Sequence, residues 1–215
     1  MKLSAKEIEF IDNYLDNSGV SYADIRMEIT DHVASQIENT MQISKEADFY
    51  TVFKAYMVKD KAGLLKENKR FINTVTKQNA KLIIKELLAL RTIILFLALV
   101  FLSNYFINNL SLDSIKLLFA IPLFLMVPLA IAYFICSKKY NFSRFSGVER
   151  LAFMFTILFH ICHLTSIIMK PNIEAGISTI YISTAFVSCI ILIYSFIKVS
   201  INIIQSYLLR YKNIA

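Results

Sequence analysis

Glycine, proline and cysteine are scarce in this sequence and tryptophan is absent: the 215 residues include only 4 Gly, 3 Pro and 3 Cys. So few glycines and prolines exclude a collagen-like or low-complexity chain, and three cysteines exclude a disulfide-rich scaffold. The four glycines stand far apart, which excludes the glycine-rich loops that bind nucleotide phosphates. The sequence also contains no Gly-x-Ser-x-Gly elbow and no His-Glu-x-x-His motif. It therefore predicts a protein that is not an enzyme.

Apolar residues are abundant instead, at 56% of the chain, while charged residues make up 18%. Ordinary soluble domains contain about 45–50% apolar and about 25% charged residues. Four stretches, at about 92–108, 117–136, 151–169 and 177–197, contain no Lys, Arg, Asp or Glu. A helix needs about 20 such residues to cross a hydrocarbon core of roughly 30 Å. We therefore expect an all-α polytopic membrane protein, in which a four-helix transmembrane bundle contacts the lipid bilayer and follows an N-terminal soluble helical domain.

The positive charges predict how the chain is threaded through the membrane. Cations gather before the first apolar stretch, between the second and third, and after the fourth, whereas the other two connections carry one lysine each. Because Lys and Arg concentrate in cytoplasmic loops, we expect a multi-pass chain with both termini in the cytoplasm. The net charge of +7 is not concentrated into a dense basic face. We therefore expect no nucleic-acid partner.

Small residues and prolines in the apolar stretches bear on helix packing. Thr184 with Ser188, and Ala185 with Cys189, are pairs at i,i+4 spacing, which lets neighbouring helix backbones approach closely. Two prolines, at 122 and 128, are expected to kink the second membrane helix or to leave carbonyls free inside the bundle. Packing accounts for both features, and a transport pathway is the alternative.

The soluble domain is expected to be helical throughout. Ser4 and Glu7 form a capping box, and the apolar stripe that follows ends at Gly19. A second helix is expected to bury one stripe, and a third helix is expected to begin at Ser44. Beyond Gly63 we expect one long basic helix over 64–91 that continues into the first membrane helix. The apolar stripe expected on the second helix consists of Tyr22, Ile25, Ile29, Val33, Ile37 and Met41.

The predicted domain boundaries follow from these elements. Residues 1–63 form the cytosolic helical domain, 64–91 the connecting helix, 92–204 the transmembrane domain and 205–215 a cytosolic tail.

One polar cluster in the soluble domain is a candidate site for partner binding or pH sensing. On a helix, Glu28 and His32 are four residues apart and Glu28 and Asp31 are three apart, so the three side chains share one flank. A carboxylate beside an imidazole can raise its pKa into a pH-sensing range. The alternative is that His32 borders the apolar stripe and only hydrogen-bonds Glu28 or a helix end.

The region from residue 8 to residue 69 resembles the HAAS-type cytosolic domains that precede transmembrane helices, and especially uncharacterised four-span flavobacterial membrane proteins. The resemblance implies a signalling or interaction domain, often encoded beside PadR-like repressors. Residues 39–42 depart from the family, which has a helix-ending glycine there, so the resemblance does not set the end of that helix. The matching residues are Tyr14, Leu15, Glu28, Asp31, His32, Ala34, Ile37, Glu38, Phe49 and Gly63.

Two histidines in the third apolar stretch are the second candidate site. His160 lies near the middle of that stretch and His163 lies one turn further along the same face. Ionisable groups at this depth are costly and are by default functional candidates. The pair is half of a possible metal or haem site or of a proton relay, but no other apolar stretch contains His, Asp or Glu. The alternative is neutral imidazoles that hydrogen-bond across the bundle, with no cofactor.

Three functions remain open from the sequence. The first is a non-enzymatic signalling, docking or accessory protein, whose cytosolic helical domain binds a protein partner. The alternative to a separate partner is that copies of this chain form a homo-oligomer. The second is a membrane protein that handles a metal, haem or protons through His160 and His163. The third is a small transporter or a transporter's accessory subunit.

Overall fold

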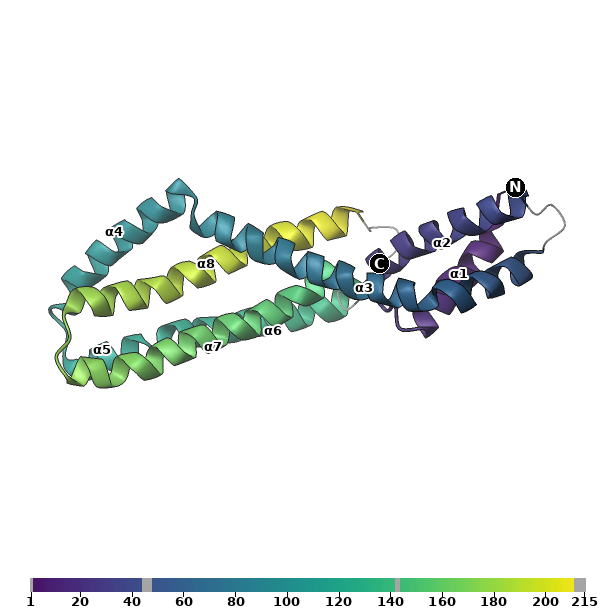
Figure 1. Ribbon diagram of the computed structural model, residues 1–215. Coiled ribbons are helices and arrows are strands. Elements are labelled where there is room, and N and C mark those ends of the chain that lie inside the picture. Colours follow the sequence, from purple (N-terminus) through teal and green to yellow (C-terminus); the bar gives the residue numbers. More distant parts are fainter. Residues whose placement is uncertain (1, 44–47, 142–143, 211–215) are drawn as a thin grey trace. The chain divides into compact units, whose positions relative to one another are not determined.

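The computed structural model describes residues 2–43, 48–141 and 144–210, and every regular element in these ranges is a helix (Figure 1). This confirms the predicted all-α fold class. The chain divides into two compact units, Met1–Lys77 with Ser143–Ser146, and Gln78–Phe142 with Gly147–Ala215. The helices are α1 (Ala5–Asn17), α2 (Ala23–Ile43), α3 (Phe49–Leu87), α4 (Leu90–Ile107), α5 (Leu112–Leu118), α6 (Ile121–Tyr140), α7 (Ser146–Glu174) and α8 (Thr179–Arg210).

The first unit packs α1, α2 and α3 as far as Lys77 around one apolar core. The predicted capping box is present, because the Ser4 side chain accepts from the Glu7 N–H and the Glu7 carboxylate accepts from the Ser4 N–H. Gly19, at φ +96°, makes the turn into α2. The predicted α2 stripe is buried from Tyr22 to Ile37, and its last member, Met41, packs partly buried against the same core.

A buried arginine joins α1 to α2. Arg26 is 7% exposed. Its guanidinium donates to the carboxylates of Asp12 at 3.0 Å and Asp16 at 2.6 Å, and to the Val20 carbonyl at 3.2 Å. An acid of α2, Asp24, accepts from the N–H and hydroxyl of Ser146 within the same unit. The guanidinium therefore satisfies polar groups in the α1–α2 turn as well as two acids.

One helix, α3, takes the place of the expected third helix and most of the expected connecting helix over 64–91. Gly63 lies inside α3, so the expected boundary between a third helix and a connecting helix over 64–91 is wrong. The predicted cap at Ser44 lies outside the described residues. Asp48 caps α3, since its carboxylate accepts from the N–H and hydroxyl of Thr51.

The chain does not pass from α3 into α4 as one helix. α3 ends at Leu87, and α4 begins at Leu90 after Ala89, whose ψ of 135° is extended. Figure 1 shows α4 leaving the end of α3 at an angle. The continuous helix predicted to run to residue 91 is therefore wrong, because its last residues belong to α4.

Four helical segments in the described chain are long and apolar enough to cross a membrane: Leu90–Ile107, Leu112–Tyr140, Ser146–Glu174 and Thr179–Arg210. This confirms the predicted number of spans. The second consists of α5 and α6, and the break falls just before Pro122, which occupies the first turn of α6, where its missing N–H costs no hydrogen bond. Pro128 lies inside α6. α8 continues to Arg210, so residues 205–210 of the predicted tail belong to the last helix.

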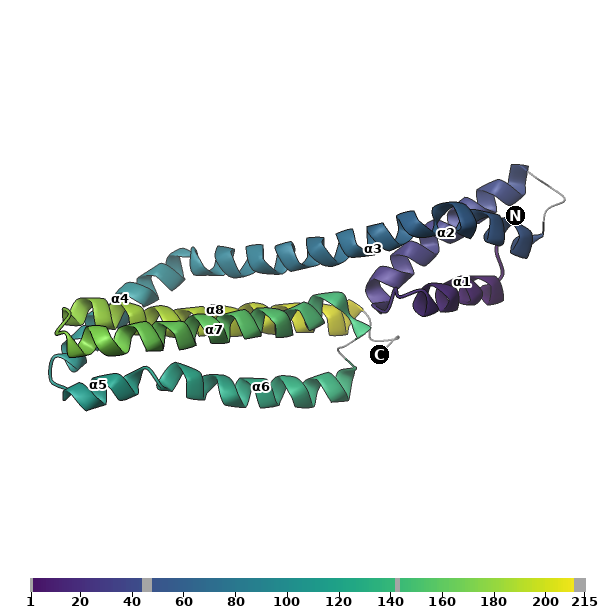
Figure 2. The same ribbon diagram turned by 60° about the horizontal axis from the view of Figure 1, so that its bottom comes forward.

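The second unit is built around α8. α4 lies against α8, and apolar residues of α6, α7 and α8 form one buried cluster, which we call the α6–α8 cluster. Figure 2 shows α7 and α8 running side by side. Of the predicted small pairs, Cys189 is buried in this cluster and Ala185 packs beside a second one. The hydroxyls of Thr184 and Ser188 donate to carbonyls four residues earlier in α8 itself. These two hydroxyls therefore donate their hydrogen bonds within α8.

A glycine near the start of α7 lies in close contact with a side chain of α8. A Cβ added at Gly147 would collide with the ring and hydroxyl of Tyr207. The Gly147 carbonyl accepts from the buried Asn79 amide at 2.9 Å. Gly147 is therefore held between side chains of α3 and α8, and a larger residue there would have to displace the outer end of the Tyr207 side chain.

Candidate functional site

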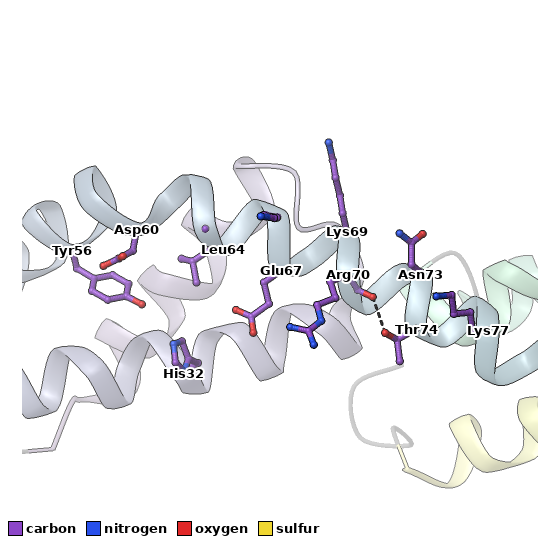
Figure 3. A pocket seen from close by; sticks show the side chains of 12 residues that line it. His32, Tyr56, Asp60, Leu64, Glu67, Lys69, Arg70, Asn73, Thr74 and Lys77 are labelled. Carbon is purple, nitrogen blue, oxygen red and sulfur yellow. Dashed lines mark hydrogen bonds between the residues drawn. The ribbon is translucent and has the colours of Figure 1, made fainter.

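A groove of about 770 Å³ lies between α2 and α3 in the first unit. We call it the His32 groove. Figure 3 shows His32 pointing from α2 toward α3, while Glu67 and Arg70 point from α3 toward α2. Its lining residues include His32, Tyr56, Asp60, Leu64, Glu67 and Arg70.

The charges of the His32 groove are divided along its length. The acids Asp60 and Glu67 lie on α3 near Tyr56, and cations including Arg70 and Lys77 continue along the same helix. Partial burial raises the pKa of Tyr56, and the carboxylates of Asp60 and Glu67 raise it further, because both effects disfavour a phenolate. The groove therefore presents a protonated phenol, an imidazole, two acids and one lysine, Lys66, toward one end, and cations alone toward the other.

The predicted cluster of Glu28, Asp31 and His32 lies on the exposed side of α2. His32 enters the groove, but Glu28 and Asp31 are not among its lining residues. The structure brings His32 together with Asp60 and Glu67, which are about 30 residues away in the sequence. Sequence reasoning missed this grouping because it depends on how α2 and α3 align.

A second groove of about 830 Å³ lies between α1 and α3 and is mainly aromatic. We call it the aromatic groove, and its apolar lining includes Phe10, Tyr14, Tyr50, Phe53, Met57 and Val58. Tyr50 is 63% exposed and Val58 is 83% exposed. The Phe10 ring forms T-shaped contacts with the rings of Tyr50 and Phe53. The ring centroids are 5.3 Å and 5.2 Å apart.

Two lysines flank the aromatic groove. Lys54 and Lys61 are both in its lining, and the Lys61 ammonium donates to the Tyr14 hydroxyl at 3.3 Å. Phe49 and Phe53 are buried in the core of the first unit, whereas Phe10 and Tyr50 are exposed. The aromatic groove could not be predicted from the sequence. The exposure of Phe10 depends on the rotation of α1 against α3, which its own sequence does not fix.

The two histidines of α7 are exposed on the outer side of that helix. The Phe159 ring stacks on His163, 6.1 Å between centroids at 11°. In the described ranges, no three His, Cys, Asp or Glu side chains gather as a metal site would require. Cys162 of α7 and Cys189 of α8 are buried, within the cluster that α6, α7 and α8 form. The structure therefore does not bring the thiols and the imidazoles together.

A charged cluster stands where α3 ends and α4 begins. The Glu86 carboxylate accepts from Lys198 at 2.8 Å, from Arg91 at 2.9 Å and from the Thr92 hydroxyl at 3.3 Å. The Glu86 side chain is 11% exposed. The Lys198 hydrogen bond is the main cause that lowers the pKa of Glu86, and Arg91 contributes in the same direction. The cluster links the end of α3 to both α4 and α8.

Replacing Glu86 with glutamine should destabilise the second unit by about 1 kcal/mol at pH 7, because two cations lose a charged acceptor. The pKa of Glu86 is lower in the folded chain than its ordinary 4.5, so its contribution is complete above that value and is lost as the pH falls through the folded pKa. Thermal unfolding of the detergent-solubilised chain at pH 7 and below pH 4.5 measures this. The difference between parent and Glu86→Gln should shrink at the lower pH.

A matched control is Glu9→Gln, which changes an exposed glutamate of α1. It should leave the unfolding temperature unchanged at both pH values. An equal loss from both variants would contradict a specific role for the Glu86 cluster.

Comparison with family models, with curated proteins and with solved structures found no match to this chain.

Proposed function

We propose that this chain is a non-enzymatic docking protein of a bacterial inner membrane, whose N-terminal helical domain holds a protein partner on the cytosolic side. The aromatic groove is the observation that carries the proposal. Exposed apolar patches on soluble surfaces mark interaction sites, and aromatic side chains supply most of the energy at such interfaces. The resemblance to HAAS-type domains and the distribution of cations along the sequence support the same function and orientation.

The chemistry of the aromatic groove favours an amphipathic helix as its occupant. Exposed Phe10, Tyr50 and Val58 offer apolar contacts to a helix that presents a stripe at three- and four-residue spacing. The flanking Lys54 and Lys61 favour acidic side chains beside that stripe, since opposite charges across an interface speed encounter and suppress wrong partners. The partner segment is therefore a helix with acids bordering its apolar face.

Site-specific photo-cross-linking in cells of the native host tests this function. A benzoylphenylalanine at Tyr50 should form one adduct of defined mass with a second polypeptide. Phe10→Ser combined with Val58→Ser should lower the adduct yield about tenfold or more, because interface aromatics carry most of the binding energy. Phe10 is 39% exposed and its ring also packs on the buried Phe53, so the circular dichroism of the double variant must match that of the parent before their adduct yields are compared.

The matched control places the cross-linker at Met27, an apolar residue of α2 whose 41% exposure resembles the 39% of Phe10. Met27 lies outside both grooves. Equal yields at Tyr50 and Met27, or adducts that the double variant leaves unchanged, would contradict docking at the aromatic groove.

A further inference from the structure

A row of exposed residues follows α7 along its outer side, and we call it the α7 seam. Its members are Phe153, Thr156, His160, His163 and Ile167. Their spacing alternates between three and four residues, which is the spacing of the contact positions in a coiled coil. All five are exposed, whereas Leu151, Leu158 and Cys162 on the other side of α7 are buried in the α6–α8 cluster. The α7 seam is therefore a complete helix-pairing surface that this chain does not cover.

Two members of the α7 seam have polar groups that hydrocarbon cannot satisfy. A neutral imidazole has one N–H donor and one nitrogen acceptor. Among the described residues, neither His160 nor His163 hydrogen-bonds another side chain or carbonyl, and their ring contacts are with Phe159. Thr156 differs, because its hydroxyl donates to the Ala152 carbonyl. A membrane-spanning helix that faced lipid with this seam would leave both imidazoles without partners in the middle of the bilayer.

We propose that α7 pairs with α7 of a second copy of this chain along the α7 seam, so that each imidazole meets an imidazole of the partner copy. Two copies insert with the same topology, so their α7 helices run in the same direction. In a parallel two-fold pair, each seam position faces the same position of the other helix. His160 then faces His160, and His163 faces His163.

The pairing satisfies the groups that a single copy leaves open. Within each pair, the N–H of one imidazole donates to the bare nitrogen of the other, so no ion and no change of protonation is needed. Phe153 and Ile167, on either side of the histidines, supply apolar contacts. Polar side chains that hydrogen-bond between membrane helices are a recognised source of association in lipid. The polar site is thus incomplete in one chain and complete in two.

Light scattering of the full-length chain in detergent, over a range of protein-to-detergent ratios, measures the dimer. His160→Ala combined with His163→Ala should raise the dissociation constant about tenfold or more, since interhelical hydrogen bonds in membranes contribute about 1–2 kcal/mol. The matched control is Ile161→Ala with Ile168→Ala, which changes two exposed residues of α7 outside the seam. The control should dimerise like the parent chain.

Cysteine cross-linking in native membranes tests the register without relying on stability. In a chain whose three cysteines are replaced by alanine, a single cysteine at Phe153 or Ile167 should form an intermolecular disulfide with a mild oxidant. A single cysteine at Ile161 or Ile168 should form little.

Three results would overturn the proposal. The first is a parent chain that stays monomeric at every protein-to-detergent ratio. The second is that cysteines at Ile161 and Ile168 cross-link as well as those at Phe153 and Ile167. The third is that EDTA dissociates the dimer. The last result would mean that a bridging cation holds the seam in place of paired imidazoles.

Discussion

Replacing Arg26 with methionine should destabilise the first unit by about 2–4 kcal/mol, the largest effect expected from any single side chain there. Methionine keeps most of the side-chain volume but removes the donors to Asp12, Asp16 and the Val20 carbonyl. The two carboxylates can still reach water, because their side chains are 35% and 52% exposed. The buried carbonyl at the α1–α2 turn has no such route, so much of the loss comes from leaving it unpaired.

Hydrogen–deuterium exchange on the full-length chain measures this loss locally. Amides of α1 and α2 should exchange faster in Arg26→Met, while amides of α8 should keep the parent rates. Lys59→Met is the control, since it removes an exposed cation of α3 in the same unit. Equal exchange in Arg26→Met and Lys59→Met would show that the guanidinium contributes no more than a surface charge.

Local features of this fold could be predicted from the sequence because each depends on neighbours in the chain. The Ser4–Glu7 capping box needs only a three-residue spacing, and the α2 stripe needs only steps of three and four residues. The four apolar segments follow from length and composition alone. These predictions are confirmed because no distant contact competes with them.

The helix boundaries show where local signals fail. Gly63 was expected to end a helix, yet α3 continues through it, because Met57 before it and Leu64 after it are both buried in one core. A glycine inside a helix costs only about 1 kcal/mol, which such packing offsets. In contrast, α3 ends at Leu87 with no glycine or proline nearby, where Glu86 bonds Arg91 and Lys198. Lys198 lies far away in the sequence, so this contact could not be predicted.

The direction in which His160 and His163 point was beyond sequence reasoning for a different reason. In a soluble helix, polar residues mark the solvent side, so a stripe of apolar residues reveals the core. In a helix that crosses lipid, both the core side and the lipid side are apolar, and the periodicity disappears. The pair could equally have faced the bundle. Only the packing of Leu158 and Cys162 against α8 places the histidines on the outer side.

Gly147→Ala should destabilise the second unit by about 1–3 kcal/mol, although alanine favours helices over glycine. The new methyl group would occupy the space of the Tyr207 ring, so α7 and α8 would have to separate or the tyrosine would have to leave its position. Thermal unfolding of the solubilised full-length chain measures the change. Gly63→Ala is the control with the opposite sign: its Cβ meets no atom within 4 Å, so it should stabilise α3 by up to about 1 kcal/mol.

A double-mutant cycle separates collision from any other effect of the alanine. Tyr207→Leu removes the atoms that the Gly147→Ala methyl would meet, so the double variant should be more stable than the sum of the two single changes predicts. The coupling reports on the α7–α8 contact directly, because the helix propensity of alanine is the same in both backgrounds. If the two changes simply add, the Tyr207 ring does not limit the approach of α7 to α8. The hydrogen bond from Asn79 is kept in either case, because its acceptor is the backbone carbonyl of residue 147, which alanine also has.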